Sequence, residues 1–299
     1  MTHRRPTPLR ERTRGAEEHP IGIICGGGSI PIAVARAAQK RKRKVMLFPL
    51  RGFADPAVEK FPHEWMHLGA VGTLVTAMRN AGCRDIVMIG SLVRPRPWDV
   101  RFDFTTVMLV PRLLPLFRGG DDRLLTGVAK LLEERGFRLI GAHEVAPEIL
   151  MPAGPIGRHR PKAVDKDDIR FGFSLLNAIG PFDVGQAAAV AGLRTLAVEA
   201  AEGTAAMLAR LAEMRRNGRL RLPARAGVLV KAPKPGQDRR FDLPAIGPDT
   251  VEQARAAGLN GIAVAARSAV VADAAALVRA ADKAGLFVVG VRPERRKRG

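Results

Sequence analysis

The 299-residue chain has no tyrosine, only two cysteines, and no apolar run near the length of a membrane-spanning helix. A spanning helix needs about 20 predominantly apolar residues, so we expect no such segment. Cys25 and Cys83 lie far apart and match no metal-ligand spacing. Two cysteines in so long a chain make no disulfide framework, which favours a reducing compartment. Aromatic residues are 5% of the chain and do not alternate with basic ones, as they do in many single-stranded nucleic-acid binders.

Acidic residues are scarce relative to basic ones, 29 against 49, and the formal net charge is +20. Part of this excess lies in two basic tails, residues 1–18 and 294–299, which we expect to be disordered. The rest is spread through the body, where it attracts nucleic acid, anionic lipid or a phosphorylated substrate. No nucleic-acid motif accompanies the charge. The N-terminus is polar and lacks a secretory apolar region, so we expect a cytoplasmic protein.

The residues that are abundant indicate a soluble α/β protein, with 46% apolar and 26% charged residues. The chain is long enough for two domains. We predict a Rossmann-like N-terminal domain over residues 19–150, because short apolar runs alternate there with amphipathic stretches. Such a β-α-β order forms a parallel sheet whose ligand crevice lies at the carboxyl ends of its strands. Its expected strands are 21–25, 44–50 and 85–92, and its expected helices are 30–41, 72–82 and 120–137.

A linker is predicted at residues 151–163, which hold three prolines and two glycines without periodicity. A C-terminal α/β catalytic domain then follows over residues 164–293. Asp183-Val-Gly-Gln186 is expected to precede a helix; we favour Asp183 as its N-cap, and the alternative is that Asp183 joins the charged site described below. The other expected elements are helices at 165–180, 203–218, 250–258 and 273–285, and strands at 194–200, 226–232, 261–266 and 287–291.

One apolar segment, residues 105–117, has two interpretations. Its sequence TTVMLVPRLLPLF carries a single arginine. We expect a core helix interrupted by proline, and a segment that touches lipid is the alternative.

A glycine-rich loop joins the first strand to the first helix at Gly26, Gly27, Gly28 and Ser29. Glycine lets a phosphate approach the backbone, and a helix start supplies N–H donors and a positive dipole. The spacing is not G-x-G-x-x-G, and no acidic residue ends the second strand, which argues against NAD. A nucleotide diphosphate and a plain turn both remain open. Arg94, after the third strand, is either a phosphate clamp or a surface arginine.

Residues 231–244 form the most informative stretch, a proline-rich loop with two carboxylates among several cations. Mg²⁺ prefers carboxylate oxygens, and phosphoryl transfer needs cations around the phosphate oxygens. A charged surface loop with internal ion pairs is the alternative. Glu199 and Thr204, near another helix start, are further candidates for metal and phosphate contacts. The charged residues of the loop are Lys231, Lys234, Asp238, Arg239, Arg240 and Asp242.

Five strings of the sequence together resemble the LpxI family of UDP-2,3-diacylglucosamine hydrolases. They are IGIICGGGSIP, GDDRLL, GAHEVAPEIL, DVGQAAAVAGLRTLAVEAAEGT and VKAPKPGQDRRFDLPAIGPDT. The resemblance covers about residues 19–293, and KPGQDRRFDLP is its most specific part. It implies Mg²⁺-dependent hydrolysis of the pyrophosphate of UDP-2,3-diacylglucosamine to UMP and 2,3-diacylglucosamine 1-phosphate, in lipid A synthesis. It also implies a Rossmann-like N-terminal domain, a catalytic C-terminal domain and substrate enclosed between them.

The resemblance implies that Asp238, directly after Gln237, is the essential aspartate. We expect Asp238 to be catalytic and to bind Mg²⁺ together with Asp242. An Asp follows Glu-Gly-Thr in the family's pattern, and Ala205 stands there in this chain, which shifts metal binding toward the loop. The predicted substrate-binding residues are Gly26, Gly27, Gly28, Ser29, Arg94, Thr204, Lys231, Lys234, Gln237 and Arg239.

The expected partners are a nucleotide-linked lipid and the anionic inner face of the inner membrane, touched peripherally. Nucleic acid is not an expected partner, and a homo-oligomer is an open alternative. A nucleotide-sugar binding protein without catalysis is the alternative function, and a charge-driven nucleic-acid binder is a second one.

Overall fold

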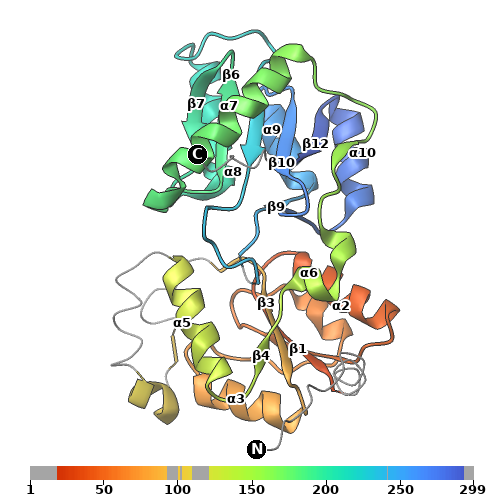
Figure 1. Ribbon diagram of the computed structural model, residues 1–299, viewed down its shortest axis with the longest axis vertical. Helices are drawn as coiled ribbons and strands as arrows, with labels where there is room; N and C mark the ends of the chain where they lie inside the picture. The colour runs from red at the N-terminus through yellow and green to blue at the C-terminus, as the bar shows by residue number, and fades with distance from the viewer. Residues whose placement is uncertain (1–18, 93–99, 102, 110–120, 241, 293–299) are drawn as a thin grey trace, which may run out of the picture. The chain divides into compact units, whose positions relative to one another are not determined.

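The computed structural model describes residues 19–92, 100–101, 103–109, 121–240 and 242–292. The chain divides into two compact units, Met1–Pro147 and Glu148–Gly299. We call them the N-terminal and C-terminal units. Each contains one main β-sheet with helices packed on it (Figure 1). This confirms the predicted two-domain α/β fold.

The N-terminal unit has a four-stranded parallel sheet in the order β2-β1-β3-β4. All five residues of β1 are buried, as expected for a parallel strand covered on both faces. The order places β2 and β3 on opposite sides of β1, so the topological switch point lies between β1 and β3. Ligands of open α/β sheets bind at such points. The strands are β1 (Ile21–Cys25), β2 (Val45–Pro49), β3 (Asp85–Ile89) and β4 (Arg138–Leu139).

The helices of this unit follow the predicted alternation. Pro31 lies in the first turn of α2, where its missing N–H is not needed. A short helix also covers residues 104–109. The named helices are α2 (Ile30–Lys40), α3 (Val71–Asn80), α5 (Asp121–Glu133) and α6 (Ala142–Val145), with the 3-10 turns η1 (Pro56–Lys60) and η3 (Pro147–Ile149).

The C-terminal unit has a six-stranded mixed sheet in the order β5-β12-β10-β8-β6-β7. Its strands β8, β10 and β12 are mutually parallel, whereas β6 runs antiparallel to both β7 and β8. A separate parallel pair joins β9 to β11. The strands are β5 (Gly154–Ile156), β6 (Ala187–Ala191), β7 (Arg194–Val198), β8 (Val228–Lys231), β9 (Ala245–Ile246), β10 (Gly261–Ala265), β11 (Val270–Val271) and β12 (Phe287–Val291).

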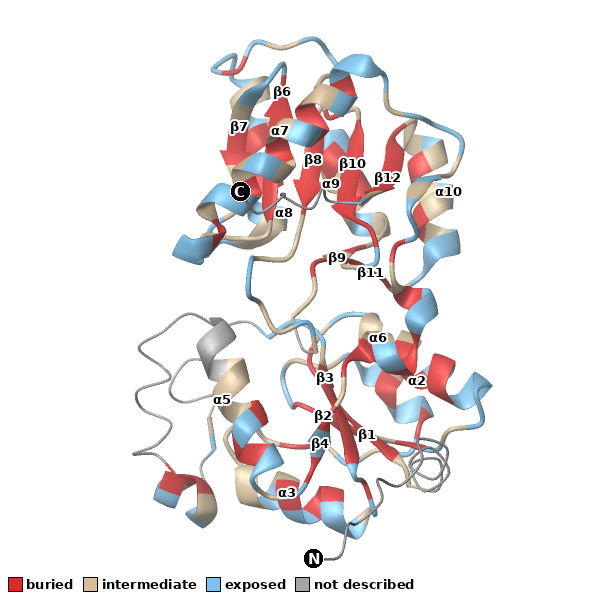
Figure 2. Cartoon of the chain, in the orientation of Figure 1, coloured by how far each residue is buried: buried red, intermediate tan, exposed pale blue. Residues whose placement is uncertain are grey.

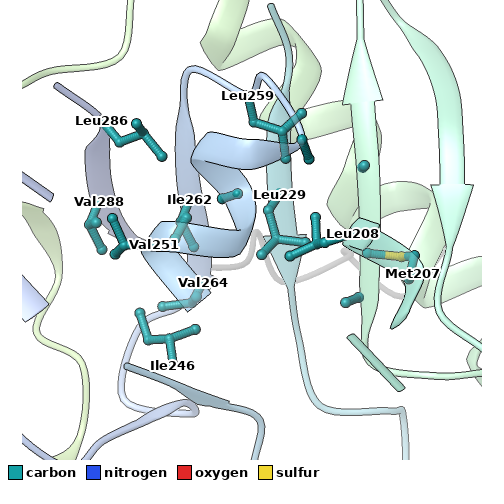
Figure 3. Close-up of a cluster of buried hydrophobic side chains, with 14 of the residues drawn as sticks. Met207, Leu208, Leu229, Ile246, Val251, Leu259, Ile262, Val264, Leu286 and Val288 are labelled. Atoms are coloured by element: carbon teal, nitrogen blue, oxygen red, sulfur yellow. The ribbon is translucent and has the colours of Figure 1, made fainter. Parts of the chain in front are cut away.

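Alternating side chains of this sheet face two different helical layers. Val228 and Val230 of β8 join the cluster beneath α7, whereas Leu229 joins the larger cluster with α8, α9 and α10 (Figure 3). Figure 2 shows the resulting buried strands in red between partly exposed helices. The helices are α7 (Ala163–Ile179), α8 (Gly203–Arg216), α9 (Pro248–Ala256) and α10 (Ala274–Ala284), with the 3-10 turn η4 (Gly180–Phe182).

Two stretches differ from the sequence-based expectation. The helix expected after Gln186 is the strand β6, and the N-cap prediction for Asp183 is wrong. Asp183 instead ends η4 in the left-handed region, with φ of 56°. Every residue of β6 is buried between β7 and β8, so sheet pairing overrides the helix propensity of its alanines. Part of the expected linker is the strand β5, which pairs with β12.

The segment 105–117 is described only as far as residue 109. Thr106 and Leu109 are buried, as the core-helix interpretation expects, whereas Val107 and Met108 are exposed. The remainder of that segment lies outside the described residues. No helix of the described residues is long and apolar enough to cross a membrane.

Candidate active site

Three strand ends of the C-terminal unit meet at one edge of its sheet. Because β6 is antiparallel to both neighbours, its start lies beside the end of β8 and the end of β7. The backbone N–H of Ala232 donates to the carbonyl of Gln186 (3.0 Å), and that of Glu199 donates to Ala187 (2.9 Å). The backbone N–H of Gln186 also donates to the Glu199 carboxylate (3.0 Å). Polar residues from three distant parts of the sequence are therefore neighbours.

Lys231, the last residue of β8, places a buried ammonium group at this edge. Its Nζ donates to Oγ1 of Thr204 (3.0 Å) and to the carbonyl of Ala245 (3.1 Å). The hydroxyl of Thr204 in turn donates to Oε1 of Glu199 (2.8 Å). Burial lowers the pKa of Lys231, and the negative charges of Glu199 and Asp242 oppose this shift. Lys231 thus connects β8 to the start of α8 and to β9.

Asp242 lies in the loop between β8 and β9, near the start of β9, and accepts hydrogen bonds that hold this end of the loop. Its Oδ1 accepts a hydrogen bond from Nε2 of Gln186 (3.1 Å), and its Oδ2 accepts one from Nε2 of Gln237. Oε1 of Gln237 accepts from the backbone N–H of Lys234 (2.9 Å). Lys234 also forms an ion pair with Asp183. The loop is therefore held by side chains rather than by a regular ladder.

Asp238 lies in the middle of this loop and pairs with Arg240. The backbone N–H of Arg240 donates to its Oδ1 (3.0 Å), and the guanidinium donates to both carboxylate oxygens at 2.8–3.1 Å. These contacts with Arg240 hold the pKa of Asp238 below its ordinary value, although partial burial opposes the shift. The side chain is 29% exposed. It is therefore an ionised carboxylate within reach of a ligand.

Neighbouring Arg239 has a different partner. Its guanidinium donates to the backbone carbonyl of Arg267, which precedes β11. The structure thus brings Thr204, Lys231, Gln237, Asp238 and Asp242 into one region, with Lys234 and Arg239 at its margins.

Mg²⁺ has a limited set of donors here. Among the described residues, no group of three or more His, Cys, Asp or Glu side chains is placed to hold a metal ion. The carboxylates of Asp238 and Asp242 each accept N–H bonds from side chains. Mg²⁺ commonly uses one or two carboxylates together with substrate phosphates. These residues fit an ion that arrives with phosphate oxygens rather than one that the protein holds alone.

The glycine-rich loop lies at the switch point of the N-terminal sheet. The N–H of Gly26 donates to Ile89 (2.9 Å), while Gly27 and Ser91 exchange two backbone hydrogen bonds of 2.7 and 2.9 Å. A Cβ on Gly26 would lie 2.6 Å from the Ser91 carbonyl oxygen. Gly26 and Gly27 therefore allow two chain segments to approach each other.

The open part of that loop is Gly28 and Ser29. Gly28 has a φ of +88°, and a Cβ built on it would meet nothing within 4 Å. Ser29 precedes α2 and makes no side-chain capping bond, and both residues are exposed. These two residues remain available to a phosphate at the N-terminus of α2. Arg94, the other predicted phosphate contact of this unit, lies outside the described residues.

Sequence reasoning missed the role of Gln186 as an Asp242 partner. Its position directly before an apolar run was a usable signal, but the run was interpreted as a helix. The carbonyl of Ala245 carried no recognisable sequence signal, whereas the Arg240 pairing of Asp238 is an internal ion pair of the kind that the alternative interpretation of this loop expected.

Comparison with known proteins identifies the family. Residues 20–149 match the family model described as the LpxI N-terminal domain, and residues 152–289 match the LpxI C-terminal domain. A curated relative is the UDP-2,3-diacylglucosamine pyrophosphatase LpxI of Caulobacter vibrioides, which is 40% identical over 276 residues. The aligned region covers 92% of this chain and 99% of the relative. The chain therefore belongs to the LpxI family.

Proposed function

We propose that this protein hydrolyses the pyrophosphate bond of UDP-2,3-diacylglucosamine to UMP and 2,3-diacylglucosamine 1-phosphate, in lipid A synthesis. The full-length similarity to a pyrophosphatase of that name supports the substrate. The observation that carries the chemistry is the ionised, partly exposed Asp238 in a loop rich in cations. Water attacks one of the two phosphorus atoms, the bond from that phosphorus to the bridging oxygen breaks, and the other phosphate monoester leaves with this oxygen while a proton of the water is released.

Asp238 suits the positioning of water or of a metal better than strong proton abstraction. Its pairing with Arg240 lowers its pKa, and a weaker base draws less strongly on the proton of water. Arg240 and Lys234 bring positive charge to the same loop, where the phosphate oxygens gather negative charge during the reaction. We assign Asp238 as the catalytic residue and these cations as substrate contacts.

The remaining polar residues hold this loop in place. Lys231 bonds both Thr204 and the Ala245 carbonyl, while Asp242 is bonded by Gln186 and Gln237. A rigid support of this kind keeps reacting groups within the small tolerance that catalysis requires. Thr204 keeps its predicted role as a substrate contact in this proposal, because its hydroxyl lies at the start of α8.

Mg²⁺ is part of the proposal, and Asp238 and Asp242 are the residues that would hold it, each in exchange for side-chain N–H contacts that its carboxylate accepts here. When bound, the ion would polarise a phosphoryl oxygen and neutralise charge. Gly28 and Ser29 would contact phosphate or nucleotide in the N-terminal unit. We further propose a cytoplasmic protein that meets its lipid substrate at the inner membrane as a peripheral partner.

The test is to incubate the purified full chain with detergent-solubilised UDP-2,3-diacylglucosamine and to follow UMP by chromatography. We expect stoichiometric UMP and diacylglucosamine 1-phosphate, with loss of turnover in EDTA and recovery on adding Mg²⁺. Binding of the lipid without release of UMP would contradict catalysis and favour a nucleotide-sugar binding protein. Turnover that persists in EDTA would contradict the metal requirement alone.

A further inference from the structure

The 104–109 helix of the N-terminal unit exposes an apolar face. Phe104 is 82% exposed, Val107 54% and Met108 68%. The spacing i, i+3, i+4 places the three side chains on one side of a helix. They form an apolar stripe, which we call the 104–108 face. The exposed large apolar side chains among the described residues are Leu92, Phe104, Val107, Met108, Val164, Phe182 and Leu193, so three of the seven fall within five positions.

The opposite side of this helix is fixed to α3. Asp103 accepts four hydrogen bonds, two from backbone N–H groups and two from hydroxyls, all provided by Thr73 and Thr106 at 2.7–3.2 Å. Oγ1 of Thr106 accepts from the backbone N–H of Val71 (2.9 Å). One carboxylate thus caps the N-terminal turns of both helices.

Close packing strengthens this attachment. A Cβ on Gly72 would lie 2.5 Å from Oγ1 of Thr105, so α3 and the short helix meet at contact distance. Thr106 and Leu109 are buried on the inner side. The exposed side chains therefore belong to a helix that is anchored, and they do not reflect a loose chain segment.

The charge around this helix in the sequence is positive. Between residues 92 and 118 the chain has five arginines, two aspartates and neither lysine nor glutamate. One of the aspartates, Asp103, accepts the capping hydrogen bonds and keeps its negative charge, and the five arginines still leave this stretch with a net positive charge. Arg101, three residues before the helix, is exposed. An apolar helix face in a stretch of sequence with net positive charge is typical of helices that lie in the interface of anionic membranes.

We propose that the 104–108 face inserts into the surface of an anionic lipid bilayer and docks the protein there. This proposal rests on the peripheral association named above and assigns it a surface. A bilayer is favoured over a folded protein partner because the stripe is narrow and the sequence that flanks it has a net positive charge. Large exposed apolar patches on soluble proteins mark such interaction sites.

The test compares flotation of the full chain with vesicles of pure phosphatidylcholine and of phosphatidylcholine mixed with phosphatidylglycerol. The variant is Phe104→Ser/Met108→Ser, which leaves Asp103 and Thr106 intact. The matched control is Val164→Ser/Phe182→Ser, which also removes two exposed apolar side chains, 54% and 79% exposed. Thermal melting of each variant checks that it is folded.

We expect the wild type to float with the anionic vesicles and the 104/108 variant to bind at least about tenfold more weakly, since insertion of each large apolar side chain is strongly favourable. The control should bind within about twofold of the wild type. Equal binding by the 104/108 variant, equal loss in the control, or no binding by the wild type would overturn the proposal. Dimers that dissociate only in the 104/108 variant, seen by light scattering, would make the face an interface between copies. Flotation needs no turnover, so failure of the proposed hydrolysis would leave this result unchanged.

Discussion

Replacing Lys231 with methionine tests whether the buried ammonium group holds the loop between β8 and β9 in place. The substitution keeps a long side chain but removes donors to Thr204 and to the carbonyl of Ala245. A hydrogen bond from a charged group contributes about 1.5–3 kcal/mol. Two such bonds total about 3–6 kcal/mol. Methionine avoids the cost of burying an ammonium group, and this offsets part of the loss. We expect the free energy of unfolding to fall by about 3 kcal/mol, near the low end for broken buried charge contacts.

The assay is urea unfolding followed by circular dichroism, in a double-mutant cycle with Thr204→Val. Thr204 accepts from Lys231 and donates to Glu199, so the two substitutions share a contact. We expect a coupling free energy of about 1–2 kcal/mol. Lys166→Met, at an exposed position of α7, should change stability by less than about 0.5 kcal/mol. Destabilisation by Lys231→Met below about 1 kcal/mol, together with zero coupling, would refute the reasoning.

The pH dependence of the free energy of unfolding provides a second test of the role of Lys231. Burial lowers the pKa of Lys231 from 10.5 in the folded protein, whereas the unfolded chain retains the ordinary value. Between these two pKa values the unfolded state binds more protons, so this group makes stability rise with pH. Lys231→Met should lack that rise. A wild type and a variant with parallel stability curves between these two pKa values would contradict the assignment.

Three further predictions concern other positions. Arg240→Gln removes the contacts that depress the pKa of Asp238, so the acidic limb of the kcat/KM profile should move to higher pH. An acidic limb at the wild-type pH would show that a group other than Asp238 causes it. Gly90→Ala should lower the free energy of unfolding by at least about 2 kcal/mol more than Gly28→Ala, because its Cβ would lie 2.7 Å from the Gly26 backbone whereas Gly28 has open space; equal melting temperatures would count against this contact. Burial raises the pKa of the Cys25 thiol to about 12, so iodoacetamide at pH 8 should modify Cys25 only after urea unfolding, as peptide mass spectrometry can show; rapid labelling of the folded protein would disprove its burial.

Most of the fold could be predicted from the periodicity of apolar residues. Continuous apolar runs such as Ile21–Cys25 appear as buried parallel strands, and the β-α-β order correctly indicated the N-terminal sheet. The strand Ala187–Ala191 could not be predicted this way. Alanine favours helices in isolation, and pairing with two antiparallel strands determines its state: β7, which follows directly in the chain, and the distant β8.

The candidate site was predictable in its residue types but not in its contacts. The density of carboxylates and cations around Asp238 indicated a site for Mg²⁺ and phosphate. Its supports are long-range: Gln186 reaches Asp242 across 56 residues, and Thr204 reaches Lys231 across 27. No local pattern encodes such pairs. Gly26 likewise suggested a phosphate contact, whereas its packing against Ser91 depends on the strand order.

Asp238→Asn is the most direct test of our proposal that Asp238 is the catalytic residue in hydrolysis of a nucleotide-linked lipid. The control is Asp249→Asn, which changes an exposed aspartate of α9. UMP release and binding of UDP-2,3-diacylglucosamine are measured for both variants. We expect Asp238→Asn to lose at least about a hundredfold in kcat while it still binds the lipid, and Asp249→Asn to match the wild type. An Asp238→Asn enzyme that retains more than about a tenth of the wild-type kcat would contradict the account.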